Sequence, residues 1–317
     1  MRCQQLKLST VDVFKHIKKS DSNIELVGAS LQALQRVLCM MLRDFSVAAD
    51  ASGARWTLSG GTCLGAIRHH GFIPWDDDVD VNLVHEDLPK LAASLEELYP
   101  GKYLVQIPGL TDGYDLGFAR VRLNGTIVRS RDDIGAPESA CGAYIDVFLL
   151  ESVPNNRFLR VVHGFVSMGL GFCCSCRRFL AYSDVYNALV TEDEEAFAVF
   201  RRKERIGKLV SFKTAASWAT LWNRWNSMCH DDGSEFLSIP VGRKHYFGEL
   251  YRRDAFFPAR NVRFKSEDLP VPCVPEVYMT ALYGPDFMTP PPEADREVHI
   301  VYEFDLGRYG TVKEQGD

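Results

Sequence analysis

The chain has 317 residues, of which 46% are hydrophobic and 25% charged, and its net charge is -6. This length suffices for one large domain or two of average size, and the balance is typical of a soluble globular protein. A negative chain without a broad basic field is not expected to bind nucleic acid. The nine cysteines follow no regular spacing and the N-terminus shows no apolar leader, so we expect reduced thiols in the cytoplasm.

The first predicted elements lead into a glycine turn. Apolar residues recur at helical spacing over residues 31–45, which predicts an amphipathic helix. The segment "RWTLSGG" predicts a strand at residues 56–58 and a turn at Gly60 and Gly61, and "TCLGAIRHH" predicts a helix that begins there. Backbone N–H groups at such a helix start can bind a phosphate, to which Arg68 would add a bidentate contact. Glycines also occupy such turns for backbone reasons alone.

Four aspartates follow in "PWDDDVDVNL". The alternation over residues 78–83 predicts a strand with Asp78 and Asp80 on one face. A later strand, "GAYIDVFLLESVP", places Asp146 among apolar residues, where a charge needs a partner or a cation. Carboxylates from two neighbouring strands are the oxygen ligands that Mg²⁺ prefers, so we predict a metal site at these three residues. The alternative is that the aspartates only cap a turn and form salt bridges.

A helix and a hairpin are predicted between these two strands. Residues 88–99 predict the helix, and "FARVRLNGTIVRS" predicts two strands paired about a turn at Asn124 and Gly125. Arg120 and Arg122 share one face of the first hairpin strand. Either residue would reach a donor phosphate, and the alternative is an exposed cross-strand charge ladder.

The composition turns helical from residue 157 to about residue 235. Its most apolar stretch, "FLRVVHGFVSMGLGFCCSC" at residues 158–176, is too short without interruption to span a membrane and predicts a buried helix. A peripheral contact with an anionic membrane surface, at the inner face of the membrane, is the alternative. The "CCSC" run at Cys173 to Cys176 is interpreted as reduced, semi-buried thiols, because no second Cys/His pair at zinc spacing accompanies it.

These patterns indicate a single domain that carries a helical insertion. Residues 1–50 form an N-terminal helical segment, and residues 51–155 form a core with the metal site. Residues 156–235 form the helical insertion, and residues 236–317 complete the same domain with a tail rich in proline and aromatic residues.

Three separated motifs, in the right order, resemble the LicD family. They are "WTLSGGTCLGAIRHHGFIPWDDDVDVNL", "GAYIDVFLLESVP" and the C-terminal "FKSEDLPVPCVPEVYMTALYGPDFMTPPP" with "REVH". The resemblance covers residues 30–299 except for a gap near residues 166–234. The family is similar to the nucleotidyltransferase superfamily and has fukutin and the fukutin-related protein as animal relatives. The resemblance implies an α+β fold with a mixed sheet flanked by helices.

The resemblance also implies an activity. It implies transfer of phosphocholine or a similar phospho-alcohol from a CDP-activated donor, typically CDP-choline, to a hydroxyl of a cell-surface glycan or lipid-linked glycan, with release of CMP. If the roles of the family's motif residues hold at the matching positions of this sequence, the ligands of Mg²⁺ or Mn²⁺ are Asp76, Asp78, Asp80 and Asp146. The donor phosphates would then lie at Gly60, Gly61, Arg68 and Arg120. Asp77 occupies a more variable place in the family pattern and is left out.

A mechanism follows as a hypothesis. The metal would bridge the donor pyrophosphate and align the acceptor hydroxyl, while Asp146 takes the hydroxyl proton. One alternative is a true nucleotidyltransferase that transfers NMP from an NTP and releases pyrophosphate; another is a scaffold without turnover. Such chemistry needs electrostatics more than an imidazole, so His69, His70 and His299 are expected to be structural. Trp75 is expected to pack beside the aspartates.

Overall fold

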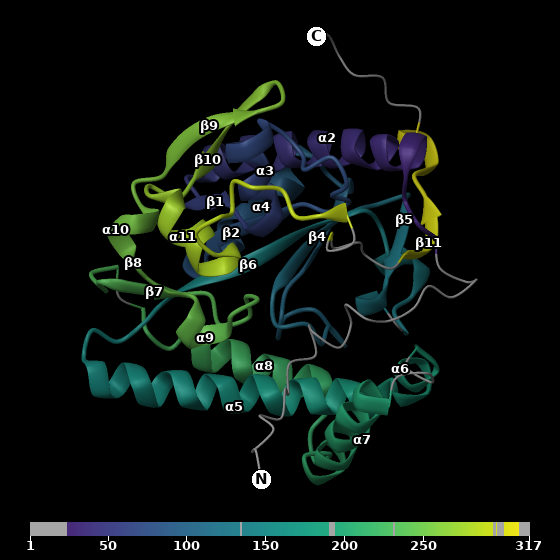
Figure 1. Cartoon of the computed structure of the whole chain (residues 1–317), viewed down its shortest axis with the longest axis vertical. Coiled ribbons are helices and arrows are strands. Elements are labelled where there is room, and N and C mark those ends of the chain that lie inside the picture. Colours follow the sequence, from purple (N-terminus) through teal and green to yellow (C-terminus); the bar gives the residue numbers. More distant parts are fainter. Residues whose placement is uncertain are drawn as a thin grey trace.

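The computed structural model describes residues 24–310, apart from residues 134, 190–193, 231, 294–295 and 297–300. Helices and strands are mixed along this part of the chain (Figure 1). The helices are α2 (Gly28–Ser52), α3 (Gly60–His69), α4 (Leu88–Leu98), α5 (Arg157–Ala181), α6 (Ser183–Leu189), α7 (Glu194–Leu209), α8 (Ala215–Asn226), α9 (His245–Gly248), α10 (Arg253–Phe256) and α11 (Pro275–Tyr283). The strands are β1 (Trp56–Leu58), β2 (Asp80–Val84), β3 (Tyr103–Gln106), β4 (Ala119–Leu123), β5 (Ile127–Ser130), β6 (Tyr144–Ser152), β7 (Phe236–Ser238), β8 (Leu250–Arg252), β9 (Arg260–Phe264), β10 (Glu267–Val271) and β11 (Val301–Asp305).

One mixed sheet organises the molecule. Its strands run in the order β1-β2-β6-β4-β3, and the far end of β6 pairs with β7, which pairs with β8. The strands β2 and β6 are parallel, whereas the other pairs are antiparallel. The two further pairs, β9 with β10 and β5 with β11, form small sheets of their own. The expected α+β fold with a mixed sheet is confirmed.

The main core lies between this sheet and α2. The apolar stripe predicted over residues 31–45 is buried along its whole length in α2, which confirms that helix. Val81 of β2 and Val147 of β6 pair in register and are fully buried, and the aspartates alternate with them on the opposite face of the sheet. Within this core, Phe45 and Trp56 make an edge-to-face contact with ring centres 5.0 Å apart.

The predicted hairpin about Asn124 and Gly125 is wrong, although both of its strands exist. The strand β4 pairs with β3 and β6, whereas β5 pairs with β11 in a separate sheet. Leu123 and Val128 donate backbone hydrogen bonds to residues 141–143, the segment that enters β6, and not to each other's strand. The Asn124 N–H donates to the carbonyl of Lys102. Tertiary hydrogen bonds therefore open the turn into a crossing between two sheets.

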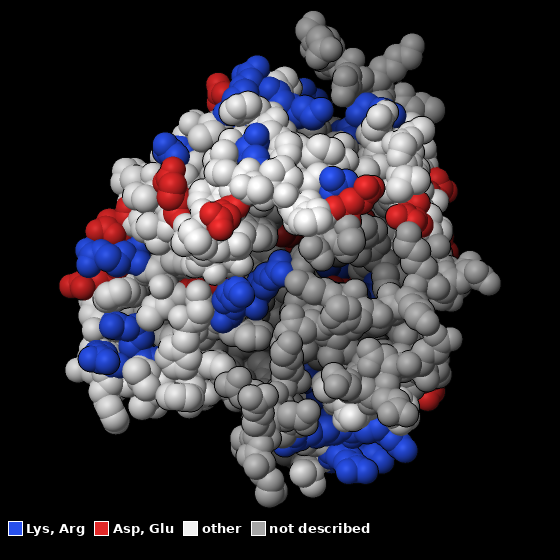
Figure 2. All heavy atoms as spheres, viewed as in Figure 1, with Lys and Arg blue, Asp and Glu red and all other residues white. Residues whose placement is uncertain are grey.

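A layer of helices, α5 to α8, covers the other side of the molecule. In Figure 1, α5 runs along the lower edge with α8 between it and the sheet, and α7 projects below its C-terminal half. Figure 2 shows Lys and Arg side chains gathered at this lower edge, where α7 lies. The expectation that residues 158–176 form a buried helix is only half right. The helix exists, but one of its faces is exposed, because α7, α8 and α9 pack against other parts of its surface.

The cysteines described by the structure are free thiols. In the "CCSC" run, Cys174 and Cys176 are buried on α5, and burial raises the pKa of the Cys174 thiol to about 12. Burial also raises the pKa of Cys173 and that of Cys176, the latter to about 11. Neutral thiols are poor nucleophiles, so these three side chains are suited to packing and not to catalysis.

Candidate active site

The glycine turn between β1 and α3 lies against two aspartates. Gly60 has a left-handed backbone with φ of +46°, and a Cβ there would lie 2.8 Å from Oδ2 of Asp80. A Cβ on Gly61 would lie 3.0 Å from Oδ2 of Asp76. Glycine therefore leaves the room that both carboxylates occupy, in addition to its freedom at positive φ. The structure brings these four predicted residues to one place.

The loop before β2 gathers a compact group of carboxylates. One oxygen from each of Asp76, Asp77 and Asp78 lies within 4.8 Å of the others. The loop is held by the Asp76 N–H, which donates to the carbonyl of Ile73 at 2.9 Å, and by Gln35 of α2, whose Nε2 donates to the Asp76 carbonyl at 2.8 Å. Asp77, which the sequence analysis left out of the site, belongs to this group. Asp77 joins the other two carboxylates because the loop is curved, and no local sequence pattern predicts that curvature.

Three neighbouring strands carry a row of charged side chains at the same level of the sheet. Asp80 of β2 pairs in register with Asp146 of β6, which pairs in register with Arg120 of β4. The predicted proximity of Asp80 and Asp146 thus follows from the parallel pairing of their strands. The partner that we expected for Asp146 is Arg120, whose Nε contacts Oδ1 and whose Nη2 donates to Oδ2 at 3.0 Å.

Arg120 lies behind the aspartates and not at an open surface. Its side chain is 1% exposed, and its guanidinium carbon lies 4.0 Å from the ring centre of Tyr144. Arg122 is also buried, and both arginines contact Asp133. An exposed charge ladder is therefore wrong for this pair. In this geometry Arg120 holds Asp146, and its direct contact with a donor phosphate stays a prediction.

The ion pair with Arg120 influences the pKa and the orientation of the Asp146 carboxyl. Burial raises the pKa of its carboxyl, and the Arg120 guanidinium opposes that shift. Arg120 engages both carboxylate oxygens, an arrangement that fixes orientation and makes the loss of either partner costly. Because the Arg120 guanidinium already engages both of its oxygens, Asp146 is better suited to orienting the groups of the site than to accepting a proton.

A cavity of about 150 Å³ lies beside the glycine turn. One wall is formed by the turn with Asp78 and Asp80. Most of the remaining lining comes from residues 239–283, and its polar members are Arg243, Glu249, Tyr278 and Tyr283. The sequence analysis missed all four of these residues. The two tyrosines stand in the C-terminal motif, where a closer reading could have found them, whereas no motif or periodicity marks Arg243 and Glu249.

Tyr278 of α11 fixes the glycine turn. Its hydroxyl lies 2.8 Å from Oγ of Ser59 and accepts a hydrogen bond from the Gly60 N–H at 3.2 Å. Burial raises the pKa of Tyr278 far above its usual range, so this hydroxyl stays protonated. The C-terminal part of the chain therefore shapes the site at its first helical turn.

Glu249 is a buried carboxyl in the same cavity wall. Its Oε1 accepts a hydrogen bond from the Lys244 N–H at 2.9 Å. Burial raises the pKa of Glu249 to about 7, and the hydrogen bond from Lys244 opposes this shift. A carboxyl with such a pKa can bind or release a proton at neutral pH.

Arg68 lies in the last turn of α3, near the acidic loop. Its Nη1 donates to the carbonyl of Phe287 at 2.9 Å. Burial lowers the pKa of Arg68, and the neighbouring Tyr283 and Asp76 oppose this shift. Arg68 therefore lies near Tyr283 and Asp76 but does not line the cavity beside the glycine turn, and its contact with a donor phosphate stays a prediction.

Among the other imidazole and indole groups named above, His70 is exposed, and His69 and Trp75 are partly buried. Burial and Arg68 lower the pKa of His69, and His70 ends α3 in a left-handed conformation with φ of 54°. His299 lies outside the described residues. The ring of Trp75 lies under the guanidinium of Arg296, 4.1 Å from ring centre to carbon. The structural role expected for the histidines stays a prediction.

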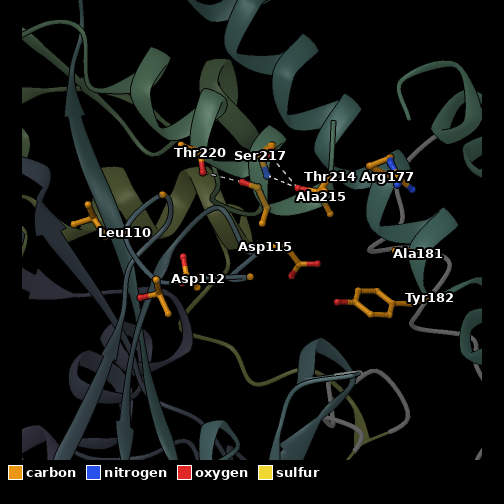
Figure 3. A pocket seen from close by; sticks show the side chains of 14 residues that line it. Leu110, Asp112, Asp115, Arg177, Ala181, Tyr182, Thr214, Ala215, Ser217 and Thr220 are labelled. Atoms are coloured by element: carbon orange, nitrogen blue, oxygen red, sulfur yellow. Dashed lines mark hydrogen bonds between the residues drawn. The ribbon is translucent and has the colours of Figure 1, made fainter. Parts of the chain in front are cut away.

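A second cavity, of about 560 Å³, lies between residues 109–115 and the helices α5 and α8 (Figure 3). In Figure 3 the carboxylate of Asp115 and the hydroxyl of Tyr182 point toward each other. Asp115 also pairs with Nε of Arg178 at 3.1 Å, and Nη2 of Arg178 donates to the carbonyl of Asp132 at 3.2 Å. An Asp132 carboxylate oxygen lies 3.9 Å from Arg120. A chain of charged groups therefore connects this cavity with the candidate site.

The donor set fits a hard divalent cation. Mg²⁺ and Mn²⁺ take oxygen ligands, and carboxylates that gather this closely repel one another unless a cation or protons compensate. Asp76, Asp77 and Asp78 form the compact group, and Asp80 faces the same glycine turn from β2. Asp146 stands beside Asp80 in the sheet. A phosphate at the turn would meet such a cation directly.

Comparison with known proteins gives a match to the segment that carries the glycine turn and the acidic loop. Residues 53–126 match the model of the family described as LicD/FKTN/FKRP, nucleotidyltransferase domain. The lipopolysaccharide cholinephosphotransferase LicD of Haemophilus influenzae is 27% identical over 123 residues, which are 38% of this chain and 44% of that protein. The ribitol 5-phosphate transferase FKRP of Homo sapiens is 51% identical over 39 residues, 12% of this chain and 8% of that protein. Residues 53–126 therefore carry a nucleotidyltransferase domain of the LicD family.

The LicD relatives named here transfer phospho-alcohols, which makes this a family of phospho-alcohol transferases. The matches span less than half of the length of these relatives. The family match contains the glycine turn and the aspartates from Asp76 to Asp80, whereas Asp146 and the wall with Glu249 lie beyond it. The acidic loop and the glycine turn are therefore the part of the site that the LicD resemblance covers directly.

Proposed function

We propose that the protein transfers phosphocholine or a similar phospho-alcohol from a CDP-activated donor to a hydroxyl of a cell-surface glycan and releases CMP. The observation that carries this proposal is the convergence of the Asp76–Asp78 carboxylates and Asp80 on the glycine turn that begins α3. Bound Mg²⁺ or Mn²⁺ would supply charge neutralisation at the donor pyrophosphate. The names of the LicD and FKRP relatives support a phospho-alcohol as the transferred group.

The donor phosphates are proposed to lie at the start of α3. Tyr278 already accepts from the Gly60 N–H, which leaves the Gly61 end of the turn to face the phosphates. Arg68 near Asp76 and Arg243 in the cavity wall offer guanidinium groups to phosphate oxygens. Arg120 acts behind this layer by holding Asp146 in place.

The acceptor hydroxyl must lose a proton when it attacks the donor. Glu249 lines the cavity and has a pKa of about 7, which suits a group that takes this proton at neutral pH. Asp146, with both oxygens held by Arg120, is proposed to orient the site instead. The polar cavity with Asp115 and Tyr182 offers hydroxyl and carboxylate groups of the kind that bind sugars, which supports it as the place of the glycan.

The first experiment measures the product that leaves. Purified protein with Mg²⁺ is incubated separately with CDP-choline, CDP-ribitol, CDP-glycerol and the four NTPs, with a surface-glycan extract as acceptor. We expect metal-dependent release of CMP from one CDP-alcohol. Asp78→Asn and Asp80→Asn should each lower this release by at least about 100-fold, because each removes an anionic ligand.

The matched control is Asp50→Asn, which makes the same chemical change at an exposed position on α2 and should leave CMP release unchanged. Release of pyrophosphate from an NTP would replace the proposal by the true nucleotidyltransferase. If no donor releases CMP or pyrophosphate, in the presence of an acceptor that a LicD enzyme accepts, the result would favour a scaffold protein without turnover.

A further inference from the structure

Helix α5 carries its large apolar side chains on the outside of the molecule. Its inner face, toward α8 and α9, consists largely of small and polar residues such as Gly164, Ser167 and His163. Its outer face is exposed and is formed by Phe158, Leu159, Val161, Val162, Phe165, Val166, Met168 and Phe172. A surface helix of a soluble protein has the opposite polarity, so this face calls for an apolar neighbour.

Hydrogen bonds hold the polar side of α5 inward. Nε2 of His163 donates to the Trp225 carbonyl at 2.9 Å, and Oγ of Ser167 donates to Oδ1 of Asn226 at 2.6 Å. Nε1 of Trp222 donates to the same Ser167 oxygen at 3.1 Å. The helix cannot turn its apolar side toward the core without breaking these contacts, and the outer face therefore stays exposed.

Contrary to the expectation that this stretch is too short to span a membrane, the length and composition of α5 would allow it to cross one. Within the described residues it is the helix that meets this criterion, with a mean hydropathy of 1.4 over a window that is 22% buried. Crossing, however, would detach the hydrogen-bonded inner face from α8 and leave its polar groups in hydrocarbon. A position along the surface buries the apolar face and keeps those bonds.

Cations gather on α7, beside the C-terminal half of α5. The helix α7 packs against α5, where Nζ of Lys203 donates to Oγ of Ser175 at 2.9 Å. The solvent side of α7 carries four exposed cations, Arg201, Arg202, Arg205 and Lys208. Figure 2 shows Lys and Arg side chains gathered at that edge, although the whole chain has a net charge of -6. This local charge is complementary to anionic headgroups.

We propose that the outer face of α5 and the cations of α7 dock the protein on an anionic lipid bilayer, with α5 lying in the interface. No charged residue interrupts α5 between Arg160 and Arg177, so a continuous apolar ridge would enter the acyl boundary. The aromatic edge extends to Phe247 of α9, whose ring centre lies 5.2 Å from that of Phe165. An apolar ridge with arginines nearby fits an anionic bilayer better than it fits a second copy of this chain. A second copy on the same face would bring the α7 cations of the two chains close together, where they would repel.

The test is sedimentation of the full chain with vesicles of phosphatidylcholine alone and of equimolar phosphatidylcholine and phosphatidylserine. We expect binding to the anionic vesicles that weakens as salt is added. The double variant Phe158→Glu with Phe165→Glu replaces side chains that are 74% and 66% exposed, and should lower the bound fraction by about tenfold or more.

The matched control is Val47→Glu with Leu98→Glu, two apolar side chains that are 46% and 44% exposed on α2 and α4. This control should bind as the unaltered protein does. A second variant, Arg201→Gln with Arg202→Gln, should weaken binding to the anionic vesicles alone. Absence of binding by the unaltered protein, equal binding by the phenylalanine variant, or a dimer without lipid that the phenylalanine variant abolishes would overturn the proposal.

Discussion

At the scale of single residues, Glu249 makes folding sensitive to pH. Its pKa is raised by burial to about 7, so the folded chain binds a proton at this site more tightly than the unfolded chain does. Stability from this group is therefore present in acid and is lost as pH rises toward 7. The change amounts to about 3 kcal/mol between roughly pH 5 and pH 8.

Glu249→Gln should remove this dependence. Relative to the unaltered protein, the variant should gain about 3 kcal/mol in free energy of unfolding when the buffer is changed from about pH 5 to about pH 8. Chemical denaturation at the two pH values measures this difference. An equal difference between the two proteins at both pH values would show that Glu249 is not a buried, titrating carboxyl.

Other residues of the site show which of its features could be predicted from short sequence segments. Asp78 and Asp80 were identified from alternation in one short segment, and both line the cavity at the glycine turn. The strand begins only at Asp80, however, so that Asp78 lies in the loop before it. Arg120 was expected at a phosphate but lies behind Asp146, because cross-strand pairing and not sequence spacing decides what a strand residue meets.

At the scale of elements, the turn from β1 into α3 depends on the absence of a side chain at Gly60. Gly60→Ala would push a methyl group against Asp80 and strain a positive φ. We expect a loss of about 1–2 kcal/mol in stability and loss of any rise in melting temperature caused by Mg²⁺.

Gly53→Ala is the matched control for this prediction. Gly53 also has a positive φ, of +63°, but a Cβ there would meet nothing within 4 Å. The control should lose stability through backbone strain but should keep any rise in melting temperature caused by Mg²⁺. If Gly60→Ala keeps the Mg²⁺ effect as well, the contact with Asp80 does not matter for the metal.

The strands β4 and β5 show the limit of local signals. Asn-Gly between two strand-like runs is a strong hairpin signal. Here the segment at residues 141–143 takes the hydrogen bonds that a hairpin would have used. Both strands were predicted correctly from their side chains, and their partners were not.

At the scale of the whole molecule, Trp222 joins the helical layer to the core. A Cβ on Gly117, in the loop before β4, would lie 2.4 Å from the Trp222 ring, and one on Gly171 of α5 would lie 2.7 Å from it. The ring therefore packs against both parts. We predict that residues 156–235 unfold together with the core as one unit.

Trp222→Ala should lower the free energy of unfolding by about 3 kcal/mol, because it leaves a large cavity at this junction. Trp222→Phe keeps most of the packing and loses the hydrogen bond to Ser167, so it should cost about 1 kcal/mol. Denaturant unfolding followed by far-UV circular dichroism and by near-UV signals measures both. Two separate transitions, with the second unchanged in Trp222→Ala, would show that the insertion is an independent unit.

The amino-acid sequence by itself determined the features that depend on near neighbours. Helical and strand periodicity, the glycine turn, the acidic loop and the LicD resemblance all lie within short segments, where side-chain spacing is set by the backbone itself. The tertiary structure decided which distant segments meet. It brought Glu249 and Tyr278 to the glycine turn, paired Arg120 with Asp146 and left the apolar side of α5 outside. These outcomes depend on strand register and on competition for burial among the whole set of elements, and no local pattern records either.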